Sequence, residues 1–203
     1  MINVTKDDAI WIITINRPEK ANSLTRRMLK DLAITIEEAA GRAQAIILTG
    51  EGEVFSAGAD LEAAKEGLAV DRIWERLSTA VENFPGLSIA ALNGTLAGGA
   101  MGMALACDLR ISVPSAKFFY PVMRLGFLPQ PSDPARLSAL VGPSRAKMIL
   151  VSGQKIEAPE ALQWGLIDRI VTRDALMETA TSLAADVVSA TPEHSAAIKG
   201  MLA

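Results

Sequence analysis

Short apolar runs alternate along this chain with longer segments in which apolar side chains recur every three or four positions. The short runs are rich in β-branched residues and end at proline, glycine or asparagine, which is typical of β-strands. Because most of these runs are apolar throughout, we expect a sheet that is covered on both faces. The predicted strands are residues 9–16, 45–49, 88–92, 109–113 and 167–171.

The longer segments have the periodicity of helices that bury one face. Residues 25–43 and 69–84 show it most clearly. Residues 97–106 are small and apolar throughout, which predicts a wholly buried helix whose glycines need a separate reason. The order of elements predicts an α/β fold in one continuous domain, because no linker or low-complexity segment interrupts it. Further helices are expected over residues 134–141, 143–152, 158–164, 174–189 and 192–202.

Composition excludes several classes of function. The 203 residues are enough to bury one core, and they include one cysteine, one histidine, 20 basic and 23 acidic residues. Cys107 has no partner for an internal disulfide, and with His194 it is too little for a Cys/His zinc site. The balanced charge argues against nucleic-acid binding, and no apolar run reaches the ~20 residues of a membrane span. We therefore expect a cytoplasmic protein with no metal, no nucleic-acid partner and no membrane association.

Two glycine-rich segments, residues 52–61 and 93–100, each follow a predicted strand. Small residues let a ligand approach the backbone, and unpaired N–H groups at the start of a helix are hydrogen-bond donors. Two such loops on neighbouring strands can direct two N–H groups at one oxygen, which is the arrangement of an oxyanion hole. The alternative is that the glycines only form turns and allow close helix packing. Neither segment has the spacing of a dinucleotide-binding fingerprint or a P-loop.

Four segments together resemble the crotonase superfamily, the enoyl-CoA hydratase/isomerase family. The resemblance implies a spiral of β-β-α units that binds an acyl-CoA thioester as its substrate, without a further cofactor. Residues 1–190 would form the acyl-CoA-binding core and residues 191–203 a short C-terminal helix, with the family's further C-terminal helices largely absent. The matching segments are residues 16–24 (NRPEKANSL), 55–61 (FSAGADL), 93–111 and 158–167 (APEALQWGLI).

The same resemblance implies where the substrate binds. The thioester oxygen would lie between the backbone N–H groups of Ala59 and Gly99, which are the implied catalytic donors. An enolate gains negative charge on that oxygen, and donors aimed in advance stabilise the charge more than the ground state. Lys20 has the alternative of a solvated loop charge, and Asp60 that of a helix cap. The implied substrate-binding and CoA-binding residues are Lys20, Ala21, Ala57, Ala59, Asp60, Leu61 and Gly99.

The family's usual acid–base carboxylates are missing from this sequence. The two glutamates that hydratases of the family use fall at Gly102 and Val122, and an aspartate that some members keep falls at Gln130. General acid–base catalysis typically contributes 10²–10⁴-fold, so efficient hydration is not expected. Isomerisation, decarboxylation and thioester cleavage need fewer carboxylates. Candidate replacements are Gln130 as a hydrogen-bonding group and Asp133 as a base, although Asp133 also fits the N-cap of a helix opened by Pro134.

Four further side chains near these segments have open roles. Tyr120 is expected in the core, and Trp74 in the core or the acyl pocket. Glu62 and Glu66 are expected on a solvated helix face, with the alternative that one of them supplies a catalytic carboxylate to the site. The mean hydropathy of +0.26 indicates apolar surface buried between subunits, so we expect a homo-oligomer, a trimer or hexamer. Two functions are predicted. One is an acyl-CoA enzyme of fatty-acid metabolism that uses an enolate-like intermediate, and the other is an acyl-CoA-binding or assembly subunit without catalysis.

Overall fold

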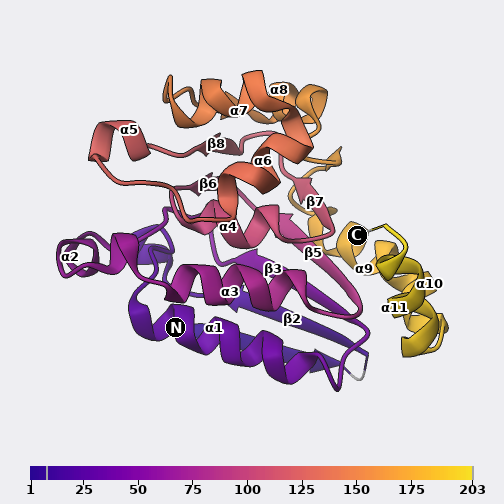
Figure 1. Cartoon of the computed structure of the whole chain (residues 1–203). Helices are drawn as coiled ribbons and strands as arrows, with labels where there is room; N and C mark the ends of the chain where they lie inside the picture. Colours follow the sequence, from indigo (N-terminus) through magenta and orange to yellow (C-terminus); the bar gives the residue numbers. More distant parts are fainter. Residues whose placement is uncertain (8, 203) are drawn as a thin grey trace.

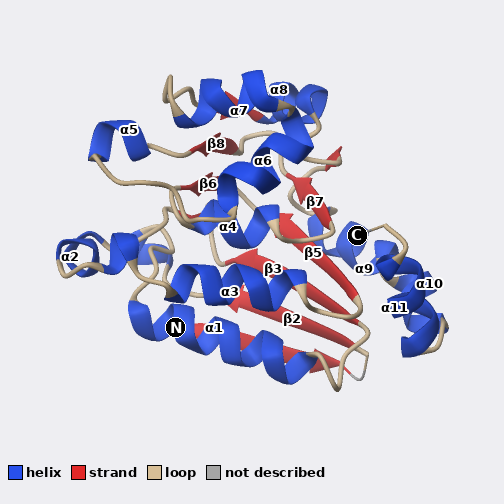
Figure 2. Cartoon of the chain, in the orientation of Figure 1, coloured by secondary structure: helices blue, strands red, loops and turns tan. Residues whose placement is uncertain are grey.

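Two β-sheets organise the structure, a computed structural model that describes residues 1–7 and 9–202 (Figures 1 and 2). The larger sheet has the strand order β1-β2-β3-β5-β7-β10 and the smaller one β4-β6-β8-β9. β1 pairs antiparallel with β2 and β9 with β8, whereas the other described pairs are parallel. The strands are β1 (Ile2–Asp7), β2 (Ile10–Ile15), β3 (Ala45–Gly50), β4 (Val54–Ser56), β5 (Leu87–Leu92), β6 (Thr95–Ala97), β7 (Leu109–Ser112), β8 (Lys117–Phe119), β9 (Ile156–Glu157) and β10 (Arg169–Ile170).

The chain alternates between the two sheets in a regular way. β3, β5 and β7 lie in the larger sheet, and each is followed within a few residues by β4, β6 or β8 in the smaller one. The segments after β4 and β6 then lead into helices that pack on the sheets. This repeat is the spiral of β-β-α units that the family resemblance implies, and the predicted α/β fold is confirmed.

Helices cover both sheets. α1 and α3 lie side by side over one face of the larger sheet, and α4 lies at the centre of the molecule (Figure 1). The six residues of α4 are all buried, as predicted for this segment. The helices are α1 (Arg26–Ala39), α2 (Leu61–Lys65), α3 (Ile73–Glu82), α4 (Ala100–Leu105), α5 (Val122–Leu125), α6 (Asp133–Val141), α7 (Pro143–Leu150), α8 (Ala158–Trp164), α9 (Leu176–Leu183), α10 (Ala185–Ser189) and α11 (Pro192–Gly200), with 3-10 turns at η1 (Pro18–Lys20) and η2 (Leu68–Val70).

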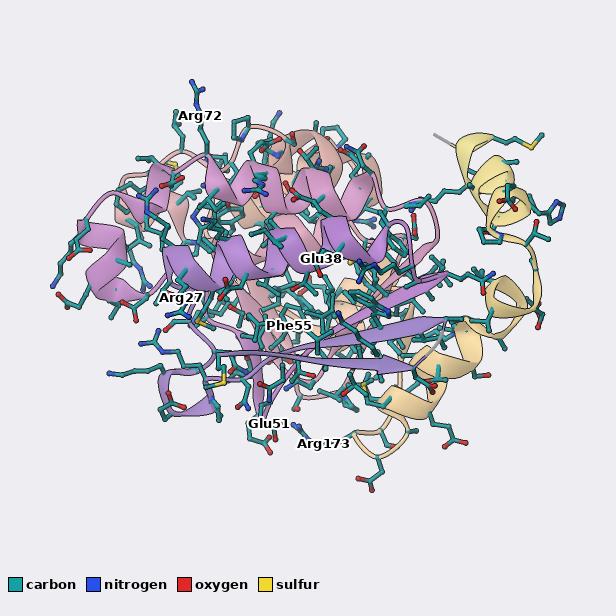
Figure 3. The ribbon with its side chains drawn as sticks, turned by 90° about the horizontal axis from the view of Figure 1, so that it is seen from below. Arg27, Glu38, Glu51, Phe55, Arg72 and Arg173 are labelled. Carbon is teal, nitrogen blue, oxygen red and sulfur yellow. The ribbon has the colours of Figure 1, made fainter. Side chains whose placement is uncertain are left out.

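The core lies between the sheets and these helices. α1 begins after Thr25, whose side chain accepts a hydrogen bond from the N–H of Met28, and it buries an apolar face against the larger sheet. Phe55 of β4 is fully buried, whereas Arg27 and Glu38 project from α1 into solvent (Figure 3). β3 is buried on both faces, as its continuous apolar sequence predicts.

Several element boundaries differ from those predicted. The helix expected over residues 97–106 begins only at Ala100, because Gly98 has a φ of +58°, outside helical space. The helix expected over residues 174–189 is divided at Ala184 into α9 and α10. The strand expected over residues 167–171 is reduced to the two residues of β10. The strands β1, β4, β6, β8 and β9 were not predicted, because they are short or mostly exposed and carry no periodic apolar signal.

The C-terminal helices α10 and α11 lie to one side of the body in both views (Figures 1 and 3). α11 has no buried residue and is held by Lys199, whose Nζ donates to the carbonyls of Phe84 and Gly86 and pairs with Asp108 at 2.8 Å. Asp8 and Ala203, which fall in the predicted segments 1–190 and 191–203, lie outside the described residues. In the remainder of the chain, no helix is long and apolar enough to cross a membrane.

Candidate active site

The candidate site lies where three parallel strands of the smaller sheet end. β4, β6 and β8 are neighbours in that order, so the segments that follow them emerge at the same edge of the sheet. These segments, with residues from α2, α3 and α5, enclose a cavity of about 140 Å³. Its lining residues are Ala57, Ala59, Leu61, Ala64, Ala69, Trp74, Gly98, Gly99, Tyr120, Pro121, Val122, Leu125, Phe127, Leu128 and Gln130.

The loops after β4 and β6 touch each other at glycines. Gly58 has a φ of +90°, and a Cβ placed on it would lie 2.8 Å from the carbonyl oxygen of Ala97 and 3.4 Å from the nitrogen of Gly99. A side chain at position 58 is therefore excluded both by backbone conformation and by contact. The sequence left two roles open for the glycines of these loops, turn formation and ligand approach. In the structure, Gly58 lets two backbone segments come into contact.

The backbone N–H groups of Ala59 and Gly99 lie on these loops. The neighbouring N–H groups of Gly58, Asp60 and Gly98 all donate to other protein groups. In contrast, the N–H groups of Ala59 and Gly99 have no hydrogen-bond partner within residues 1–7 and 9–202, and both residues line the cavity. Both residues are half-buried, so two donors on adjacent loops that face the cavity are suited to an oxygen of a ligand.

Asn22 fixes the start of the first loop. It is fully buried in the left-handed conformation, with a φ of 53°. Its Nδ2 donates to the carbonyls of Glu51 and Val54, at 2.9 and 2.6 Å, and its Oδ1 accepts from the N–H of Arg17. The carbonyl of Ala21 accepts from the N–H of Ala57 at 3.0 Å, so Ala21 supports the loop through its backbone and does not line the cavity.

Asp60 caps α2, as the alternative interpretation predicted. Its carboxylate accepts from the N–H groups of Glu62 and Ala63 and pairs with Arg17 Nη1 at 2.8 Å. The hydrogen bond from Arg17 lowers the pKa of Asp60, and the bonds from the backbone lower it further. Asp60 therefore orients α2, which carries Leu61 to the cavity wall.

The carboxylate of Asp133 turns into the protein. Its Oδ2 accepts a hydrogen bond from the Tyr120 hydroxyl at 2.9 Å, and its Oδ1 has no partner in the described part of the chain. Burial raises the pKa of Asp133 to about 6, against the lowering effects of Tyr120 and Arg136, while Glu75 raises it further. The interpretation of Asp133 as a helix cap is wrong, because its side chain accepts no hydrogen bond from the first turn of α6.

The remaining predicted residues divide between the cavity and the surface. Gln130 lines the cavity, and its side chain is held by a hydrogen bond to the carbonyl of Ala69 at 3.1 Å. Lys20 lies on the exposed turn η1 and is not among the residues of the cavity wall. Glu62 and Glu66 are exposed on or beside α2, which fits a solvated helix face.

Tyr120, expected in the core, and Trp74, expected in the core or the acyl pocket, both line the cavity. Tyr120 is buried, as expected, but it also lines the cavity directly after β8. The indole ring of Trp74 lies against Gly99, where a Cβ would come within 3.2 Å of the ring. The position of Tyr120 directly after the third strand of the smaller sheet indicates that it lies at the site. That strand has three residues and is too short to be predicted from the sequence.

Two larger hollows lie away from the two free N–H groups. One of about 770 Å³ is lined by α1, α3 and the segment of Gln130 and Pro131, and another of about 830 Å³ lies beneath α10 and α11. Neither is lined by the loops that carry Ala59 and Gly99. The chemically distinctive cavity is therefore the smaller one at the ends of β4, β6 and β8.

Comparison with known proteins agrees with this fold. Residues 5–203 match the family model described as enoyl-CoA hydratase/isomerase. The short-chain-enoyl-CoA hydratase of Clostridium acetobutylicum is 36% identical over 199 residues, covering 92% of this chain and 75% of that protein. The carnitinyl-CoA dehydratase of Citrobacter koseri is 33% identical over 210 residues, covering 98% of this chain and 78% of that protein.

Solved structures show the same architecture. The structure of Pseudomonas aeruginosa DspI superposes with a TM-score of 0.91 at 34% identity, covering 99% of this chain and 85% of that one. The enoyl-CoA hydratase of Bacillus anthracis superposes with a TM-score of 0.92 at 30% identity, covering 99% and 81%. The fold and site define a crotonase-type protein, and the chain belongs to the enoyl-CoA hydratase/isomerase family.

Proposed function

We propose that this chain binds an acyl-CoA thioester and stabilises an enolate-like form of it. The observation that carries the proposal is the pair of unpaired N–H groups, of Ala59 and Gly99, on two touching loops. A thioester oxygen placed between them accepts two hydrogen bonds that strengthen as negative charge develops on it. The family supports the class of substrate, because its relatives are named as enzymes of enoyl-CoA and carnitinyl-CoA.

The rest of the cavity fits the other parts of such a substrate. Leu125, Phe127 and Leu128 supply an apolar wall and are exposed to solvent, which suits contact with an acyl group or the pantetheine arm. Ala57 and Leu61 lie beside the thioester position on the first loop and α2. Lys20 is proposed as an exposed charge for the CoA phosphates, which lie outside the cavity.

Isomerisation, decarboxylation or thioester cleavage is favoured over efficient hydration. Hydration needs a base for water and an acid for carbon, and the described wall of this cavity carries no carboxylate. Of the two positions where the resemblance implies a glutamate, Val122 lines the cavity and Gly102 is not among its lining residues. The same observation favours one alternative, an acyl-CoA-binding or assembly subunit without catalysis. The homo-oligomer and the cytoplasmic location stay predictions.

A panel of thioesters separates these functions. We expect butyryl-CoA to bind in calorimetry, and at least one of but-3-enoyl-CoA, malonyl-CoA or crotonyl-CoA to turn over. Binding without turnover of any ester would favour the non-catalytic subunit. An absence of binding by every ester would reject both functions.

Replacing Gly99 tests the N–H donor directly. Gly99 has a φ of −59°, which proline accepts, but proline has no N–H group. Gly99→Ala is the matched control, because its Cβ meets the same Trp74 ring at 3.2 Å and the N–H stays. We expect Gly99→Pro to turn over about 10²–10³-fold more slowly than Gly99→Ala, the typical loss for one oxyanion donor. Equal rates in two folded variants would contradict the role of Gly99.

A further inference from the structure

Tyr120 and Asp133 form a buried pair directly behind the cavity, and the proposed oxyanion chemistry makes no use of it. Tyr120 lines the cavity and follows β8, whereas Asp133 is the first residue of α6. Tyr120 is 4% exposed and Asp133 is 1% exposed. The hydroxyl donates to Asp133 Oδ2 at 2.9 Å and accepts from the N–H of Gln130 at 3.3 Å. The hydroxyl is therefore oriented with its proton toward the carboxylate.

The space for Asp133 exists only because residue 102 is glycine. A Cβ on Gly102 would lie 2.6 Å from Asp133 Oδ1 and 3.1 Å from Oδ2. Gly102 belongs to α4, whose N-cap residue is Gly99, one of the proposed oxyanion donors. The carboxylate consequently lies against the same short helix that presents the thioester-binding N–H group.

Buried carboxylate oxygens nearly always have a hydrogen-bond partner. Instead, Oδ1 is buried and has no partner among residues 1–7 and 9–202, which is costly to maintain. The titratable and charged groups facing Asp133 are Tyr120 after β8, Arg136 on α6 and Glu75 on α3. Glu75 accepts hydrogen bonds from the N–H and hydroxyl of Ser132 and is a second negative charge near Asp133, whereas Arg136, the facing cation, pairs with Glu82.

We infer that Tyr120 and Asp133 form a proton relay that serves the acyl-CoA bound in this cavity, an inference that rests on the proposed function. Tyr120 is the catalytic residue, and Asp133 is a positioning residue that exchanges the proton through it. The C–H bond at the α-carbon breaks, and its proton passes to the Tyr120 oxygen while the hydroxyl proton moves to Asp133. The electron pair of that bond becomes the enolate, whose oxygen lies between the N–H groups of Ala59 and Gly99.

The return of the proton completes the reaction without any other reactant. In a β,γ-unsaturated ester, the relay delivers the proton to the γ-carbon, and the double bond moves into conjugation with the thioester. The proton that left the α-carbon is thus balanced by one added at the γ-carbon, and Tyr120 and Asp133 recover their starting states. One relay on one face of the substrate is sufficient for this isomerisation.

But-3-enoyl-CoA in D₂O tests the relay, with deuterium at the α-carbon and crotonyl-CoA formation as readouts. We expect Tyr120→Phe and Asp133→Asn each to lose at least about 100-fold in both readouts. Asparagine keeps an oxygen that accepts from Tyr120 but takes up no proton, so a carboxylate that only held the hydroxyl in place would be replaced by it without loss. Asp31→Asn, on the exposed face of α1, is the control and should match the parent protein. Calorimetry with butyryl-CoA should show affinities within about threefold of each other for all variants.

Each outcome decides one question. Variants that bind butyryl-CoA and exchange at the parent rate would overturn the relay and leave the oxyanion function standing. A parent protein that binds but neither exchanges nor isomerises would also overturn the relay. If the parent protein does not bind butyryl-CoA, the proposed function itself is rejected, and the relay with it.

The pH profile of the unmodified protein supplies a test that needs no variant. The relay requires an ionised Asp133, so the exchange rate should rise with pH through about 6, the raised pKa of this carboxyl, and then level off. The profile should lose this step in Asp133→Asn. A rate that is flat across this range in the unmodified protein, with unchanged binding, would contradict the relay.

Discussion

At the scale of single residues, the site depends on the absence of side chains. Gly58 lets the first loop contact the second, and Gly102 leaves the space that Asp133 fills. Ala59 and Gly99 contribute only backbone N–H groups. Much of the proposed chemistry therefore follows from where a Cβ is missing and an N–H is left free.

Alanine at position 58 should be more damaging than alanine at a glycine of similar conformation. Gly58 and Gly67 have φ values of +90° and +95°, but a Cβ meets the Ala97 carbonyl at 2.8 Å only in the first case. Both substitutions carry the left-handed penalty of about 1–2 kcal/mol. We expect Gly58→Ala to lose at least about 1 kcal/mol more in urea unfolding, and to weaken butyryl-CoA binding. Equal stabilities of the two variants would show that the loops do not need this close approach.

At the scale of elements, the short helices around the cavity depend on contacts more than on propensity. α4 contains a glycine and forms because all of it is buried. α2 has five residues and no buried one, which is too short to persist by itself. Asp60 gives α2 its start and ties it to Arg17.

Two substitutions of Asp60 separate capping from charge. Asp60→Ala loses the cap and the ion pair, and we expect it to cost about 1 kcal/mol in unfolding free energy. Asp60→Asn keeps a capping oxygen and loses only the charge opposite Arg17, so it should cost less than Asp60→Ala. Amide exchange in α2, measured by mass spectrometry, should rise in the alanine variant first. Equal losses in both would assign the stability to the ion pair.

At the scale of the whole molecule, the spiral brings together segments that are distant in sequence. Loops after β4, β6 and β8 meet because those strands are parallel neighbours. α11 contacts the rest of the molecule through Lys199, which donates to the carbonyls of Phe84 and Gly86, just before β5, and pairs with Asp108. Gln44 adds a hydrogen bond of 2.7 Å to the carbonyl of Ala190.

Loss of the Lys199 contacts should loosen α11 while leaving the core intact. We expect Lys199→Met to raise amide exchange across Pro192–Gly200 by at least about tenfold, because the helix has no buried residue to hold it. Exchange in β3 and β5 should stay unchanged. Lys147→Met, at an exposed position of α7, is the control. Unchanged protection of α11 in Lys199→Met would indicate that other contacts hold it.

Much of the framework was predictable from the sequence. The strands at residues 45–49, 88–92 and 109–113 and the buried helix after Gly99 follow from continuous apolar runs, which only a covered sheet and a central helix accommodate. The family resemblance placed Ala59 and Gly99 on the same site. The short strands of the smaller sheet were not predictable, because segments of two or three residues carry no period.

The sequence by itself determined the α/β order, the buried strands and the two glycine-rich loops, since these depend on local periodicity and on residues with unusual backbone freedom. Only the tertiary structure decided that the N–H groups of Ala59 and Gly99 have no partner in the described part of the chain, and that Asp133 turns inward to Tyr120. Both outcomes depend on neighbours far away in the chain. Whether a donor has a partner, and whether a carboxylate has room, is settled only when β4, β6, β8 and α6 are packed together.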